Sequence, residues 1–121
     1  IEMLVLNLFS ESVENTRFPH WLKHIVEYLN DNWNQEISLE ELANVVKVHP
    51  KTISKYFPRF FNCTLGEYRR KIKIEKSLSL IKTHKKSLTD VAYDCGFYDQ
   101  SHFISTFKQL TGFRPKQFQK L

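Results

Sequence analysis

Two short stretches decide the fold: Ser38-Leu39-Glu40-Glu41-Leu42-Ala43 and, 49 residues later, Ser87-Leu88-Thr89-Asp90-Val91-Ala92. The second repeats the residue type of the first at five of the six positions, and Thr89 stands opposite Glu40. Each begins with a Ser that is followed three residues later by an acid, which is a capping-box pattern that starts a helix. Self-similarity at a fixed offset indicates a duplicated structural unit.

Both copies continue in the same way. Ile53 and Phe57 follow the first stretch, and Phe103 and Phe107 follow the second at an offset of 50, so the second turn holds one added residue. A short capped helix, a turn, and a helix with apolar residues four apart form the pattern of a helix-turn-helix. The Ala in each first helix is small because the second helix crosses close to it.

The remaining periodicity predicts an all-α fold of about seven helices, in which two helix-turn-helix subdomains are joined by a long linker helix. Pro58 removes its own N–H and crowds the Ser54 carbonyl, so we expect the helix that starts at Pro50 to kink or stop near Phe57, which shortens its far end. The predicted helices cover 18–33, 38–46, 50–57, 64–84, a short segment from Ser87, 99–111 and a last one from Pro115.

Charge is unevenly distributed along the 121 residues. Residues 1–49 carry three basic and eight acidic side chains, a net charge of −5, whereas residues 50–121 carry fifteen basic and five acidic side chains, a net charge of +10. A basic field of this kind attracts polyanions, either nucleic acid or an anionic membrane surface. No apolar stretch approaches the roughly 18 residues of a membrane helix. The two cysteines lack metal-ligand spacing and indicate reduced thiols in a cytosolic protein.

Four segments carry a resemblance to a known family: Ala92–Phe97 (AYDCGF), Gln100–Phe103 (QSHF), Phe107-Lys108 and Gly112–Pro115 (GFRP). Together they resemble the hallmark of the AraC/XylS family of bacterial transcription regulators, and the resemblance covers about residues 20–121. It implies a cytoplasmic, nucleoid-associated regulator that binds specific double-stranded DNA as an activator. It also implies one recognition helix per subdomain in the major groove, and RNA polymerase as a further partner.

The chain departs from the family pattern at some positions. Asn62 stands where the family often has Gly, and Asn is the next-best residue for a left-handed helix cap, so we expect the turn to survive. We assign residues 1–17 to a remnant of a missing N-terminal regulatory or dimerisation domain and its linker. The expected parts after it are the first helix-turn-helix subdomain, the linker helix and the second helix-turn-helix subdomain, over residues 18–63, 64–84 and 85–121.

A recognition helix contacts bases mainly through its N-terminal residues. Because the paired apolar residues must face the core, the opposite faces read the bases, and these positions match those that read bases in the family. Lys can donate to guanine and Gln can pair with adenine, while Ser discriminates little. For each Lys, a phosphate contact without sequence reading remains the alternative. The base-contacting candidates are Lys51, Ser54, Lys55, Gln100, Ser101 and Ser105, and the phosphate-contacting candidates are Thr52, Thr89 and His102.

Two rival classes of function remain to be compared with DNA binding. For an enzyme, His20 and His24 could share a metal, but the sequence offers no third ligand, nucleophile motif or Gly-rich phosphate loop. We therefore expect no catalytic residues, cofactor or metal site. The alternative function is a helical protein–protein interaction module without DNA binding, whose apolar start, Ile1–Phe9, could dock on a partner.

Overall fold

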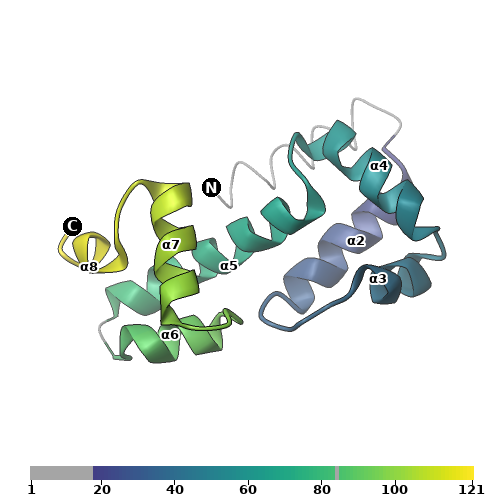
Figure 1. Ribbon diagram of the computed structural model, residues 1–121. Coiled ribbons are helices and arrows are strands. Elements are labelled where there is room, and N and C mark those ends of the chain that lie inside the picture. Colours follow the sequence, from purple (N-terminus) through teal and green to yellow (C-terminus); the bar gives the residue numbers. More distant parts are fainter. Residues whose placement is uncertain (1–17, 84) are drawn as a thin grey trace. The chain divides into compact units, whose positions relative to one another are not determined.

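Every regular element in residues 18–83 and 85–121, which the computed structural model describes, is an α-helix (Figure 1). This confirms the predicted all-α fold of about seven helices. None of these helices is long and apolar enough to cross a membrane. The predictions for residues 1–17 lie outside the described residues. The helices are α2 (His20–Asp31), α3 (Leu39–Val46), α4 (Pro50–Phe61), α5 (Leu65–Lys82), α6 (Leu88–Asp94), α7 (Gln100–Thr111) and α8 (Pro115–Gln119).

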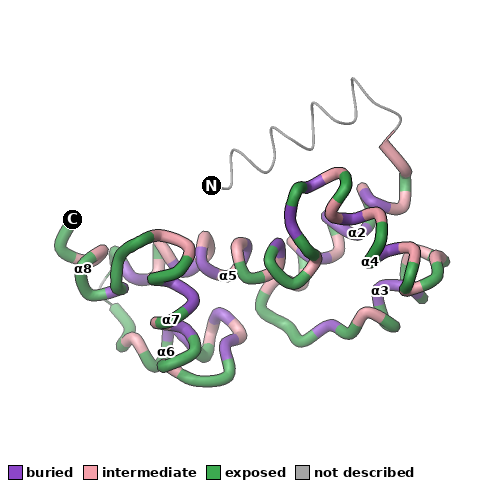
Figure 2. Tube along the Cα trace, turned by 45° about the horizontal axis from the view of Figure 1, so that its top comes forward, coloured by how far each residue is buried: buried purple, intermediate pink, exposed green. Residues whose placement is uncertain are grey.

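The chain divides into two compact units, with the boundary between Arg69 and Arg70 inside α5. In the first unit, α3 packs against both α2 and α4. Buried positions recur along these helices at helical spacing (Figure 2). Burying each large apolar side chain contributes about 1.5–3 kcal/mol. Among residues 18–69, the side chains that are 0% exposed are Leu22, Ile25, Leu42, Ile53 and Phe57.

In the second unit, α7 packs against α6 and α8. Phe103 and Phe107 are completely buried, as the repeat predicts. Their rings belong to a series of aromatic contacts, with ring centroids 5.2 Å apart for Phe97 and Phe103 and 5.8 Å apart for Phe107 and Phe118. Phenylalanine rings thus line α7 in the core of the second unit, beside aliphatic side chains such as Ile74, Ile81 and Val91.

Both predicted serine caps are present. The Ser38 hydroxyl accepts the Glu41 N–H at 3.0 Å, and the Ser87 hydroxyl accepts the Asp90 N–H at 3.1 Å. At the start of α5 a capping box is reciprocal: the Thr64 hydroxyl accepts the Glu67 N–H at 3.1 Å, and a Glu67 carboxylate oxygen accepts the Thr64 N–H at 2.9 Å. Each bond satisfies an N–H that a helix start would otherwise leave unpaired.

The two tight turns share one hydrogen-bond pattern. Val48 donates its N–H to the Ala43 carbonyl at 3.2 Å, and Phe97 donates to the Ala92 carbonyl at 3.0 Å. In both turns the residue before the donor is left-handed: Lys47 has φ 58° and Gly96 has φ 80°. This bond spans five residues and closes a helix in the manner of a Schellman motif. The same bond and the same left-handed position thus close the first helix of each pair, although the second turn is longer and only the second has glycine at that position.

The ends of α4 and α7 are also equivalent. Asn62 has φ 57° and donates its N–H to the Pro58 carbonyl at 2.9 Å, while Gly112 has φ 81° and donates to the Lys108 carbonyl at 2.8 Å. The prediction that Asn62 preserves a left-handed cap is confirmed.

The prediction that Pro58 shortens the first recognition helix is wrong. Helix α4 continues through Pro58 to Phe61. The lost bond would have gone to the carbonyl of Ser54, an exposed residue, so water can satisfy that oxygen. Phe57 and Phe61 are buried on either side of the proline, with ring centroids 4.5 Å apart. Packing of these rings stabilises the last turn despite the missing N–H.

The left-handed conformation of Lys47 predicts a stabilising substitution. Left-handed backbone costs a residue with a Cβ about 1–2 kcal/mol, and glycine loses part of that advantage through its larger entropy in the unfolded chain. Lys47→Gly should therefore raise the free energy of unfolding by about 1 kcal/mol, measured by urea denaturation. Lys47→Ala is the matched control because it removes the charge and keeps the Cβ. An equal gain in both variants would attribute the effect to the charge.

Candidate DNA interface

The start of α4 places its predicted contact residues on an exposed face. Lys51, Ser54 and Lys55 are exposed, opposite the buried Ile53 and Phe57. The helix begins at Pro50, whose missing N–H is not needed in the first turn. These three predicted side chains are therefore gathered on one accessible helix face, with the half-buried Thr52 beside them.

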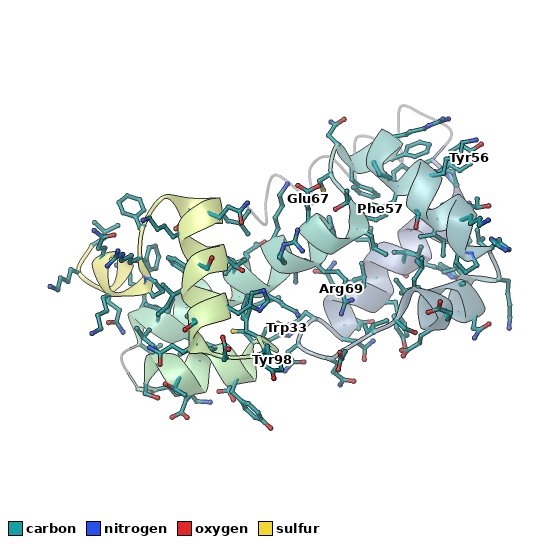
Figure 3. All side chains as sticks on the ribbon, viewed as in Figure 1. Trp33, Tyr56, Phe57, Glu67, Arg69 and Tyr98 are labelled. Carbon is teal, nitrogen blue, oxygen red and sulfur yellow. The ribbon has the colours of Figure 1, made fainter. Side chains whose placement is uncertain are left out.

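Two further features of α4 were missed from the sequence. His49 caps the helix: its Nδ1 accepts the Lys51 N–H at 3.1 Å. Arg59 extends the basic face one turn beyond Lys55, and both lie near the ring of Tyr56 (Figure 3), with Lys55 Nζ 5.4 Å and Arg59 Cζ 4.9 Å from its centroid. Because Arg59 is four residues after Lys55, the sequence alone places both on the same helix face, and this spacing could have indicated Arg59.

The start of α7 repeats this arrangement with neutral side chains. Ser101 and Ser105 are exposed and Gln100 is half-buried, while Phe103 and Phe107 face the core. A carboxylate oxygen of Asp99 accepts the His102 N–H at 2.7 Å and so caps the helix.

One hydrogen bond joins two of the predicted site residues of the second unit. The Thr89 hydroxyl on α6 donates to Gln100 Oε1 on α7 at 2.6 Å. The bond restricts the Gln100 amide to one orientation, with its Nε2 group as donor and one lone pair of Oε1 still able to accept. A phosphate contact by Thr89 would require its hydroxyl proton to turn away from Gln100, because a hydroxyl carries a single donor.

Arg69 on α5, one of the basic residues crowding the linker helix, binds the backbone of the first unit. Its guanidinium donates to the Ile37 carbonyl at 2.7 Å and to the Gln35 carbonyl at 3.1 Å (Figure 3). Desolvation by burial lowers the pKa of Arg69. These bonds fix the segment that leads into Ser38, the cap of α3.

Lys73 has a comparable position in the second unit. Its Nζ donates to the Gly96 carbonyl at 3.1 Å and lies 5.5 Å from the centroid of the Phe97 ring. The turn before α7 is therefore held by α5 as well as by its own backbone. Arg69 and Lys73 thus position the helix pairs through neutral carbonyls.

The cysteines and the His20–His24 pair are the side chains that an enzyme or a metal site could use. Cys63 and Cys95 are buried thiols that form no disulfide, and burial raises the pKa of Cys95 to about 12, which keeps it protonated and poorly nucleophilic near neutral pH. The rings of His20 and His24 have centroids 4.5 Å apart. Over residues 18–83 and 85–121, His, Cys, Asp and Glu side chains form no group of three that could hold a metal ion.

Residues 42–121 match the family model described as a helix-turn-helix domain. This region runs from within α3 to the end of the chain and contains the full set of motifs quoted for the AraC/XylS resemblance. The chain belongs to the AraC family of helix-turn-helix transcription regulators.

Curated relatives of this AraC-family domain are regulators. It is 26% identical over 123 residues to the melibiose operon regulatory protein of Escherichia coli K12, and the match covers 99% of this chain and 41% of that protein. It is 26% identical over 99 residues to the transcriptional activator RhaS of Enterobacter sp. 638, which covers 82% of this chain and 36% of that protein. The domain spans about two fifths of the length of these relatives.

Solved structures share the fold. A probable AraC family transcriptional regulator from Rhodopseudomonas palustris matches with a TM-score of 0.78 at 20% identity, over 84% of this chain and 96% of that one. The DNA-binding domain of AdpA, a global transcriptional factor solved in complex with a target DNA, matches with a TM-score of 0.75 at 18% identity, over 82% and 89% of the two chains. These similarities identify the helical arrangement of an AraC-family domain.

The bond between Thr89 and Gln100 predicts an effect on sequence reading. Thr89→Val removes the hydroxyl at nearly constant volume and frees the Gln100 amide. Binding to the preferred duplex should weaken by about 0.5–1.5 kcal/mol, the usual net value of one hydrogen bond, and the loss should concentrate on one base pair. The measurement is a titration against single-base variants of the site, with Thr89→Ser as the control that keeps the hydroxyl. An equal loss on unrelated DNA would identify Thr89 as a phosphate contact.

Proposed function

We propose that this AraC-family domain binds a specific sequence of double-stranded DNA by inserting α4 and α7 into successive major grooves. The observation that carries the proposal is the duplicated frame. Each copy has a capped first helix, the same left-handed turn, and a second helix whose accessible face begins at its N-terminus. A helix that reads bases does so mainly through that end.

The two helices differ in chemistry, so their proposed roles differ. Helix α4 presents Lys51, Lys55 and Arg59, which can donate to guanine or to phosphates. Helix α7 presents Gln100 with an oriented amide, which can pair with adenine through both of its polar atoms. We infer that α4 supplies most of the affinity, whereas α7 contributes selectivity at fewer positions.

The wider role of the protein is part of the same proposal. It acts as a transcription activator, as the relative RhaS is named, and RNA polymerase is a further partner. The proposal includes a regulatory or dimerisation domain in the complete protein; the domain described here spans 41% and 36% of the two relatives. Its location is the bacterial cytoplasm, on the chromosome, and it has no enzymatic activity of its own.

Selection of bound sequences from random duplexes tests this function directly. The domain should enrich one sequence, and its affinity should fall steeply with salt because each neutralised phosphate releases counterions. The rival reading, a helical module that binds another protein, predicts neither enrichment nor a steep salt dependence on DNA. A gel-shift titration at several salt concentrations therefore separates the two classes.

Lys55 is expected to read one base. Lys55→Ala should weaken specific binding by about 1–3 kcal/mol, and the loss should concentrate at one base pair of the selected site. Single-base variants of the duplex measure this in a competition titration. Lys23→Ala, which removes a lysine of α2, serves as the control. If the loss is the same on random DNA, Lys55 contacts a phosphate.

Successive grooves imply a fixed spacing in the DNA. The connecting helix α5 has 18 residues, or about 27 Å at 1.5 Å per residue, and one turn of B-DNA measures about 34 Å. A monomer should therefore protect two short DNA segments, called boxes here, each bound by one recognition helix and lying about 10–10.5 bp apart.

Inserting about half a turn of DNA between the boxes moves one of them to the far side of the duplex. Inserting about a full turn makes the distance between the boxes longer than α5 can span. Binding should fall to that of one box on both duplexes, as measured by quantitative footprinting. Parent-like affinity on the half-turn duplex would mean that only one recognition helix engages or that α5 bends.

A further inference from the structure

A hollow of about 340 Å³ lies beside α7 in the second unit. Its walls are the outward side of α7, the first residue of α6 and the start of α8. Helices α7 and α8 pack against each other (Figure 1), so the hollow is formed within one compact unit. The residues that line it are Leu88, Gln100, Ile104, Ser105, Lys108, Arg114, Pro115 and Lys116.

The lining combines an apolar base with three cations. Leu88 and Ile104 are half-buried and Pro115 is buried, whereas Lys108, Arg114 and Lys116 are exposed. No acidic side chain is among the lining residues. The hollow therefore has the charge of an anion site, and a guanidinium can bind two phosphate oxygens at once.

The backbone that carries two of these cations is held firmly against α7. The Thr111 hydroxyl donates to the Phe107 carbonyl at 2.8 Å and accepts the Phe113 N–H at 3.1 Å. The N–H of Arg114 donates to Gln117 Oε1 at 2.8 Å. Because the Arg114 side chain takes no part in these bonds, it can bind a ligand without disturbing the turn.

The hollow adjoins the face that the proposed function assigns to DNA. Gln100 and Ser105 belong both to its lining and to the predicted base-contacting set. A helix that lies in the major groove has a sugar-phosphate backbone on each side of it. Cations fixed beside its base-facing residues, on the α8 side, are therefore in position to meet one of these backbones.

We propose that the hollow beside α7, with Arg114 and Lys116 at its α8 edge, binds the phosphate backbone of the DNA strand that flanks the second recognition helix. This inference rests on the proposed function and extends the DNA interface to α8, which holds none of the contact residues predicted from the sequence. Phosphate contacts position a protein on the duplex without reading sequence. The hollow thus supplies α7 with affinity that its own neutral residues lack.

The test measures affinity against salt for Arg114→Gln, Lys116→Gln and the double variant. Each is titrated on the selected duplex and on an unrelated duplex of equal length. Each lost phosphate contact should reduce the slope of log K against log salt by about 0.9, and the double variant should lose about 1.8. From about 50 to about 200 mM salt, the deficit of a single variant relative to the parent should shrink about 3.5-fold. The control, Lys120→Gln, removes the same charge outside the hollow and should keep the parent slope.

The outcomes separate this inference from the function on which it rests. If the parent binds no duplex in a salt-dependent way, the proposed function fails. If the parent binds and the double variant keeps its slope, the hollow holds no phosphate and is left as a surface for an acidic protein segment, which overturns the inference. A loss confined to the selected duplex also overturns it, because phosphate contacts weaken both duplexes equally. Melting curves accompany each titration. If Arg114→Gln lowers the melting temperature, the salt slope of Lys116→Gln alone decides between the outcomes.

Discussion

The close crossing of two helices is the constraint on which each half of this domain depends. The chain must reverse direction within a few residues of Ala43, and again after Ala92, without leaving a carbonyl unpaired in the core. It does so through one bond per turn, from Val48 to Ala43 and from Phe97 to Ala92. The bond requires a left-handed residue just before its donor. Once that turn is made, the apolar faces of the helices meet and the polar start of the second helix is left accessible.

Much of this frame could be predicted from the sequence because it depends on local chemistry. Serine caps, apolar residues four apart and the offset between the copies are visible in the residues themselves, and Asn62 was correctly assigned a left-handed cap. The error at Pro58 has the opposite origin. Its effect on the backbone is local and was judged correctly as a missing bond. The rings of Phe57 and Phe61 also pack on Tyr68 of α5, with centroids 5.4 and 5.5 Å away, and these tertiary contacts outweigh the missing bond.

Side-chain pairing across helices was beyond local reasoning. The bond from Thr89 to Gln100 joins residues 11 apart and exists only because α6 and α7 cross at a particular angle. The same holds for Arg69, whose guanidinium reaches carbonyls more than thirty residues earlier in the chain. From its position on the helix alone, the Arg69 side chain could have been in solvent or near a DNA phosphate. A basic residue on a helix surface has too many available partners for the sequence to select one.

The cap of α7 also bears on how this sequence can drift over evolutionary time. A Cβ built on Gly112 meets nothing within 4 Å, so a side chain there is opposed only by the backbone, which has φ +81°. Asparagine tolerates that region better than other residues with a side chain, and Asn62 already occupies the equivalent cap of α4. Asparagine is thus the residue with a side chain that the Gly112 position should tolerate best, whereas a β-branched residue would be strongly strained there. A cap residue can therefore change without altering the faces that meet a ligand, and those faces can diverge independently of the caps.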